Sequence, residues 1–188
     1  MNNRELIEFL HIANNLKEYT RHSVSEQGRW ESVADHSWRV SLLALLLEDE
    51  LADADFNKIL RMCIVHDLGE AITKDIPSFW KSEADSAHED AVLFQWIDSI
   101  PEPQKSKLQA LFTEMLALES REAKIYKALD KIEAVLQHNE SPLSGWLPLE
   151  YELNQTYGQK EAEQADPRLV ELRQMAKEDT IKKLELGL

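Results

Sequence analysis

Hydrophobic residues recur every three or four positions along most of the chain, the spacing that places side chains on one face of an α-helix. No segment shows the sustained alternation of apolar and polar residues that is typical of a half-buried β-strand. The pattern therefore predicts an all-α fold, a compact helical bundle with a single domain over 1–188. Helices are expected over about 6–16, 35–51, 59–72, 87–100, 104–116, 120–138 and 166–186.

The segments between these helices carry turn signals. Residues 20–33 and 74–82 are predicted to be loops, and Pro77 requires the helix before it to end by about Thr73. Residues 141–165 form a looser segment marked by glycine and proline, to which the sequence assigns no function. The amphipathic final helix could pack within the chain or against a second copy through Leu169, Leu172, Met175, Ile181 and Leu184.

Composition and charge narrow the possible partners. A chain of 188 residues can bury about seventy percent of its unfolded surface in one core. The net charge of −14 argues against binding of duplex nucleic acid, although a cation and an arginine could still create a local site for a small nucleotide. The single Cys63 lies in an apolar run, and no apolar stretch is long enough to span a bilayer. We therefore expect a cytoplasmic protein without membrane partners.

The dipeptide His66–Asp67 is the first candidate for chemistry. It follows Ile64 and Val65 in a strongly apolar segment, so both polar side chains are expected to be buried, and each then needs a partner. A divalent cation would satisfy both, because imidazole nitrogen and carboxylate oxygen are ligands of Mn²⁺, Fe²⁺, Co²⁺ and Zn²⁺. The alternative is that His66 bonds a core carbonyl and Asp67 caps a neighbouring group, and for the dipeptide alone this alternative is favoured.

Two further side chains change that balance. Asp130 lies on neither the main apolar face of its helix nor the face of Lys124, Lys127 and Lys131, which is predicted to be solvated with Lys127 the nearest to Asp130. His36 lies at the N-terminal end of an apolar stripe. Taken singly, Asp130 could be an exposed aspartate and His36 a core histidine. Together, three helices each offer an inward side chain that can bind a metal.

The order His36, His66–Asp67, Asp130 resembles the HD-domain superfamily of metal-dependent phosphohydrolases. Within it, the chain looks most like the bacterial 5′-deoxynucleotidases and their eukaryotic relatives. The resemblance covers about 4–140. It rests on three strings: ESVADHS at 31–37, HDLGE at 66–70 followed by DIP at 75–77, and KALDKIE at 127–133.

The resemblance implies roles for individual residues. His36, His66, Asp67 and Asp130 would bind one divalent metal ion, which could be Mn²⁺, Co²⁺, Fe²⁺, Zn²⁺ or Mg²⁺. Glu70, four residues after His66 and therefore expected on the same helical face, would position or deprotonate the attacking water. Arg21 would bind the substrate phosphate and Asp75 a sugar hydroxyl. His22 stands where some relatives have tryptophan next to this arginine, so it is a candidate for sugar or base recognition.

Several other side chains have expected structural roles. Arg29 also matches a family position, with a role that could be structural. Trp30 is predicted to be buried, although it could replace the missing tryptophan surface. His11 and His138 are predicted to be solvated, and His88 is expected at an exposed helix start.

The predicted function is hydrolysis of a small phosphomonoester, with a 5′-(deoxy)nucleoside monophosphate as the leading substrate. One alternative is an HD hydrolase acting on another phosphorylated metabolite. Others are a non-catalytic, metal-stabilised regulatory or binding module and a helical interaction protein without metal. The family resemblance also makes a homodimer possible.

Overall fold

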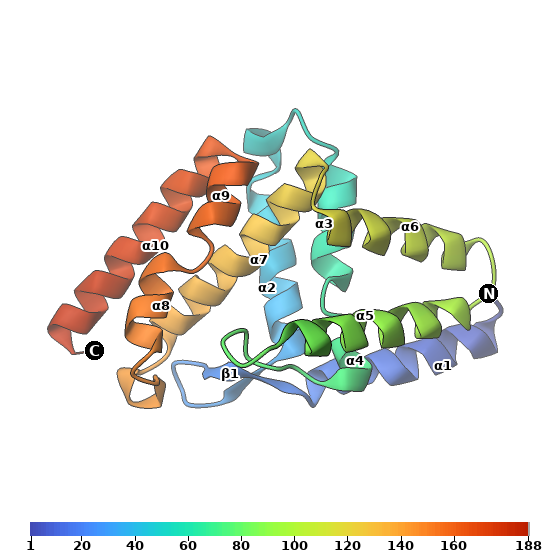
Figure 1. The fold of residues 1–188 in the computed structure, drawn as a ribbon, viewed down its shortest axis with the longest axis horizontal. Coiled ribbons are helices and arrows are strands. Elements are labelled where there is room, and N and C mark those ends of the chain that lie inside the picture. Colours follow the sequence, from blue (N-terminus) through green and yellow to red (C-terminus); the bar gives the residue numbers. More distant parts are fainter. Residues whose placement is uncertain (188) are drawn as a thin grey trace.

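A computed structural model describes residues 1–187, and most of them lie in helices packed around one long central helix (Figure 1). This central helix is α7 (Arg121–Glu140), which contacts α2 (Val33–Leu46), α3 (Phe56–Val65), α6 (Gln104–Ala117), α9 (Gln159–Ala165) and α10 (Pro167–Leu186). The predicted all-α class is confirmed. The other helices are α1 (Asn3–Ala13), α4 (Glu70–Thr73), α5 (Glu83–Asp98) and α8 (Glu150–Thr156), with 3₁₀ turns over Asn14–Lys17, Glu48–Leu51 and Leu143–Gly145.

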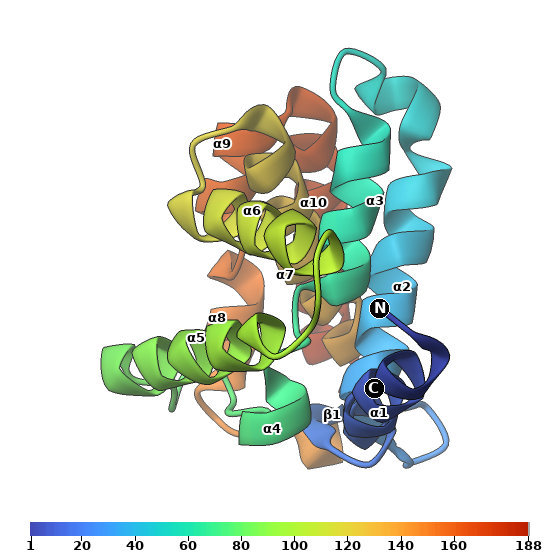
Figure 2. The same cartoon turned by 90° about the vertical axis from the view of Figure 1, so that its right-hand side faces the viewer.

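The core lies between α2, α3 and α7. Figure 2 shows α2 and α3 running side by side, and α7 contacts both of them. Each of the three helices buries an apolar face, because residues three and four positions apart point the same way. The fully buried side chains include Val40 and Ala44 of α2, Ile59 and Met62 of α3, and Leu129 of α7.

The start of α2 is fixed by a reciprocal cap. The Ser32 hydroxyl accepts a hydrogen bond from the Asp35 backbone N–H at 3.1 Å, and the Asp35 carboxylate accepts one from the Ser32 N–H at 2.9 Å. Such a capping box satisfies two N–H groups that the helix leaves free. It places His36 in the first turn of the helix.

A two-stranded hairpin stands where the sequence predicted a loop. β1 (Thr20–Val24) pairs antiparallel with β2 (Trp30–Ser32), with Thr20 opposite Ser32 and Val24 opposite Trp30. The prediction of a loop over 20–33 is therefore wrong. The strands are too short and too polar for an alternating pattern to be recognised, and the hairpin packs on α7.

The helix predicted over 59–72 is interrupted. α3 ends at Val65, turns occupy 66–69, and α4 begins at Glu70. Glu70 is therefore not on the same helical face as His66, contrary to the prediction, although the predicted end at Thr73 is confirmed. Asp67 and Gly69 are poor helix formers, and directly after the break His66 Nε2 lies 3.7 Å from Asp130 of α7.

The C-terminal quarter of the chain is more ordered than its sequence indicated. The segment 141–165 contains α8 and α9, and α10 packs within the chain on α7, α8 and α9. Leu169 of α10 is fully buried, whereas Met175 is 60% exposed. None of the helices within 1–187 has the length and apolar character needed to cross a bilayer.

Candidate functional site

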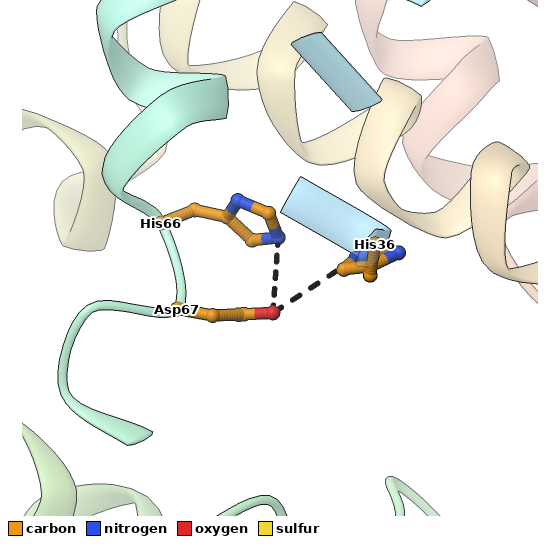
Figure 3. Close-up of side chains that lie close together, drawn as sticks. All are labelled: His36, His66 and Asp67. Carbon is orange, nitrogen blue, oxygen red and sulfur yellow. Dashed lines mark ion pairs between the residues drawn. The ribbon is translucent and has the colours of Figure 1, made fainter. Parts of the chain in front are cut away.

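The four predicted metal-binding side chains lie together. His36 comes from the first turn of α2, His66 and Asp67 directly follow α3, and Asp130 lies in the middle of α7. Figure 3 shows His36 and His66 facing the Asp67 carboxylate from two sides. The Asp67 Oδ2 atom is 3.2 Å from His66 Nε2 and 3.9 Å from His36 Nε2. We call these four residues the candidate metal cluster.

Asp130 closes the cluster from the opposite helix. Its Oδ1 atom is 3.1 Å from His36 Nε2 and 3.7 Å from His66 Nε2. Its Oδ2 atom accepts a hydrogen bond from Lys127 Nζ at 2.8 Å. Lys124, Lys127 and Lys131 are all partly buried, and Lys131 pairs with Glu161 of α9, so the prediction of a solvated lysine face is wrong.

The backbone determines which nitrogen of His66 faces the cluster. A carbonyl oxygen can only accept, so His66 Nδ1 carries the proton that it donates to the Cys63 carbonyl at 2.9 Å. The buried Nε2 atom then has a free lone pair and no hydrogen-bond partner within 1–187. The carbonyl contact of the alternative interpretation therefore exists, and it orients the second nitrogen toward Asp67 and Asp130.

His36 is oriented by a carboxylate instead. Its Nδ1 atom contacts Glu133 of α7, whose other oxygen is 3.2 Å from Arg39 Nε. Burial and Arg21 both oppose a charge on His36, but hydrogen bonds to Asp130 and Glu133 outweigh them and raise its pKa to about 10. The Asp130 and Glu133 carboxylates therefore favour a positive charge between them, and a bound metal cation would supply one.

The donor set fits a divalent cation. His36, His66 and Asp67 each offer an atom within 4.8 Å of the other two, and nitrogen with carboxylate oxygen is the usual set for first-row metals. Burial tends to raise the pKa values of Asp67 and Asp130, but contacts with neighbouring groups hold both below their ordinary value; the contact with His66 is the main one for Asp67, and the charge of Lys127 is the main one for Asp130. Both aspartates are thus held as carboxylates, the form that binds a metal.

Arg21 lies in β1 of the hairpin, at the edge of this cluster. Arg21 Nη1 donates a hydrogen bond to Asp67 Oδ2 at 3.2 Å and lies 3.9 Å from Asp75 Oδ1. Its Nε atom is 3.6 Å from Glu31 Oε2. Burial raises the pKa of Asp75, while the nearby Arg21 charge counteracts part of this shift. One guanidinium therefore links three acidic side chains around the cluster.

Glu70 lies in the same pocket and is almost fully buried. Its Oε2 atom has no hydrogen-bond partner within the described chain. Burial is the main cause that raises the pKa of Glu70 well above its ordinary value, and the charges of Asp67 and Asp75 raise it further. A buried carboxyl group with a perturbed pKa beside a candidate metal cluster is suited to general acid–base chemistry.

The pocket has a volume of about 380 Å³ and extends beyond the cluster. Arg21, His22, Asp67, Glu70, Asp75 and Asp130 all line it. The C-terminal segment contributes further lining residues, which the sequence did not indicate: Glu150, Leu153, Asn154 and Tyr157. Sequence reasoning also missed Glu31 and Glu133, although both lie inside the quoted strings and Glu133 follows Asp130 by three residues on α7.

Other predicted positions lie outside the pocket or differ from expectation. Arg29 is exposed and pairs with Asp35 at 2.7 Å, which is a structural contact at the start of α2. Trp30 is 53% exposed, so its predicted burial is wrong; its ring lies beside His22 on the hairpin surface. His138 is buried against Trp146, so its predicted solvation is wrong. His11 and His88 are exposed, as predicted.

The amino-acid sequence is similar to a known family and to proteins with assigned activities. The family model described as HD domain matches residues 13–172. The chain is 31% identical over 141 residues to the human 5′-deoxynucleotidase HDDC2, covering 73% of this chain and 68% of that protein. It is 30% identical over 113 residues to the 5′-deoxynucleotidase hdd1 of Schizosaccharomyces pombe, covering 57% of this chain and 56% of that protein.

Solved structures share the fold. A predicted metal-dependent phosphohydrolase from Magnetospirillum magnetotacticum superposes with a TM-score of 0.81 at 21% identity, covering 96% of this chain and 95% of that one. A conserved hypothetical protein from Pyrococcus furiosus superposes with a TM-score of 0.65 at 30% identity, covering 92% of this chain and 98% of that one. The helical arrangement is therefore shared along nearly the whole length.

Proposed function

Because the chain belongs to the HD domain family, we propose that it is a metal-dependent phosphohydrolase that removes the phosphate from a 5′-deoxynucleoside monophosphate. The observation that carries the proposal is the convergence of two imidazole Nε2 atoms and two aspartates beside Arg21 and Glu70 in one pocket. The relatives named 5′-deoxynucleotidase support the substrate class.

The candidate metal cluster would hold one divalent ion, which the family implies. Such an ion polarises a phosphoryl group and lowers the pKa of bound water. The nitrogen and oxygen donors suit Mn²⁺, Fe²⁺, Co²⁺ or Zn²⁺ better than Mg²⁺, which prefers oxygen ligands alone.

The other side chains of the pocket bind the substrate or transfer a proton. Arg21 binds the phosphate, because a guanidinium can donate two parallel hydrogen bonds to phosphate oxygens. Glu70 accepts the proton of the attacking water, and its buried, unpartnered Oε2 atom is available for that contact. Asp75, held beside Arg21, accepts a hydrogen bond from a sugar hydroxyl, and His22 forms part of the pocket wall.

The alternatives differ in what they require of the pocket. An HD hydrolase of another phosphorylated metabolite would use the same cluster with a different occupant. A metal-stabilised regulatory module would need neither a buried, unpartnered Glu70 nor an arginine in the pocket, and a plain interaction protein would need no cluster. Glu70 and Arg21 therefore favour an enzyme. The homodimer and the cytoplasmic location stay predictions.

The test is phosphate release from a panel of deoxy- and ribonucleoside 5′-monophosphates, with Mn²⁺, Co²⁺, Fe²⁺, Mg²⁺ or Zn²⁺ added after chelation. We expect metal-dependent release that favours the deoxy forms. Glu70→Gln should lower kcat by about 10²–10⁴-fold without changing bound metal or Tm, and the exposed Glu83→Gln is the matched control. If no nucleotide of the panel released phosphate while metal was bound, or if Glu70→Gln kept full activity, the proposal would be contradicted.

A further inference from the structure

A second group of histidine and glutamate side chains lies in the same pocket, away from the candidate metal cluster. Glu150, the first residue of α8, places its Oε1 atom 3.5 Å from His22 Nε2 and 3.6 Å from His138 Nε2. Its Oε2 atom accepts a hydrogen bond from the Leu147 backbone N–H at 2.5 Å. We call His22, His138 and Glu150 the C-terminal wall, because α8 supplies the carboxylate that joins the other two.

Glu150 is the charged group that faces both imidazoles. The Nε2 atoms of His22 and His138 are buried and have no hydrogen-bond partner within 1–187. The Glu150 side chain is only 5% exposed. Burial tends to raise the pKa of Glu150, but the contact with His138 and the Leu147 N–H lowers it below its ordinary value. A buried carboxylate therefore sits between two imidazoles that come from β1 and from the end of α7.

Arg21 and His22 are adjacent in β1, and they contact different groups in the pocket. The Arg21 guanidinium reaches Asp67, while the His22 imidazole reaches Glu150. Both residues line the one pocket. A substrate whose phosphate is bound at Arg21 and the candidate metal cluster would extend its remaining part toward the C-terminal wall.

The surface around His22 suits a flat, polar ring. The Phe79 ring meets the His22 ring edge-on, with centroids 5.7 Å apart, and Phe79 also lines the pocket. Aromatic faces with a nearby carboxylate can stack on a base and accept hydrogen bonds from it. A purely inorganic or small sugar phosphate would leave this wall without a contact.

We propose that Glu150 is a positioning residue that holds His22 in the pocket wall, and that this wall contacts the nucleoside half of the substrate. The second part rests on the proposed nucleotidase function. It gives the C-terminal segment, to which the sequence assigned no function, a direct part in substrate recognition.

The first experiment compares Glu150→Gln with Glu152→Gln, an exposed glutamate on the same helix. Glutamine keeps the size of the side chain and an oxygen for the Leu147 N–H, so the fold should be retained, as checked by Tm and circular dichroism. We expect Glu150→Gln to raise KM for a deoxynucleoside monophosphate about 10-fold at unchanged kcat. KM for deoxyribose 5-phosphate, which lacks a base, should stay the same.

The second measurement needs no substrate. In ¹⁵N-labelled protein, the imidazole signals of His22 and His138 should move in Glu150→Gln and stay in place in Glu152→Gln. Unchanged His22 signals would overturn the positioning role. Moved signals with an unchanged KM, or an equal rise in KM for both substrates, would overturn the contact with the nucleoside. A wild-type chain that releases no phosphate from any nucleotide would instead contradict the proposed function, and the nucleoside assignment with it.

Discussion

The two histidine–carboxylate groups of the pocket are built on different principles. In the candidate metal cluster, both imidazoles are fixed from behind through Nδ1, His66 by the Cys63 carbonyl and His36 by Glu133. Their Nε2 atoms then converge on two carboxylates. In the C-terminal wall, the order is reversed, since one carboxylate stands between two Nε2 atoms that have no other partner within the described residues.

This difference matches the tasks proposed for the two groups. A metal ion requires several donors in fixed directions, so each donor needs support from a neighbour. A wall that contacts a ring requires only that its side chains stay in place, for which a single buried charge is sufficient. The cluster should therefore be sensitive to its supporting residues, and the wall should be sensitive to the position of α8.

The largest effect is expected from removing support in the cluster. Glu133→Gln removes the carboxylate that contacts His36 Nδ1, while a side chain of the same size remains. We expect metal affinity to fall by about 10–100-fold, with a parallel loss of phosphate release. Calorimetric titration of the chelated protein with Mn²⁺ measures the affinity directly.

The matched control is Glu140→Gln. Glu140 bonds the same Arg39, at 2.8 and 3.0 Å, but it does not contact His36. An equal loss of metal affinity in both variants would mean that Arg39, and not the orientation of His36, is what matters.

A smaller effect, mainly on stability, is expected at the turn between α8 and α9. Gly158 has a φ of +78°, and a Cβ atom built there would lie 2.8 Å from Lys131 Cβ. Gly158→Ala therefore combines backbone strain of about 1–2 kcal/mol with overpacking of about 1–3 kcal/mol. Denaturant unfolding measures the sum. Because the turn follows α8, KM should rise more than kcat falls.

Gly28→Ala separates the two causes. Gly28 has a φ of +82° in the hairpin turn, and nothing lies within 4 Å of a Cβ atom built there. In Gly28→Ala the free energy of unfolding should therefore fall only by the contribution of backbone strain. If Gly158→Ala is no more destabilised than Gly28→Ala, the close approach to Lys131 does not contribute to the loss of stability.

The same comparison explains what could be predicted from the sequence. His36, His66, Asp67 and Asp130 lie in short strings with recognisable spacing, so the sequence predicts them, and the structure places them together. The C-terminal wall joins residues 22, 138 and 150, which share no string. His138 lies on a helix face with a polar sequence pattern, and it is buried against Trp146 and Glu150, which are distant from the helix pattern that was used for the prediction.

Local interruptions were also hidden. The break after Val65 lies within an apolar run, and it is recognisable only when the Asp67 and Gly69 positions are weighed against the helical pattern. α8 and α9 are short and polar, and their stability depends on α7 and α10. Arg173 of α10 shows this dependence, because its buried guanidinium bonds the Asn154 and Tyr157 carbonyls at 2.9 and 2.6 Å.

The smallest effect concerns pH and Glu31, which is buried beside Arg21 and the cluster. Burial raises the pKa of Glu31 to about 7 from an ordinary value of 4.5; Arg21 opposes this shift and Glu133 adds to it. Between these two pH values the folded chain keeps a proton that the unfolded chain has released. The free energy of unfolding of the metal-free protein should therefore fall as pH rises from about 4.5 to about 7. Glu31→Gln cannot titrate and should flatten this slope, as urea unfolding at pH 5, 6 and 7 would measure. An unchanged slope in Glu31→Gln would mean that another acid of the pocket holds the proton.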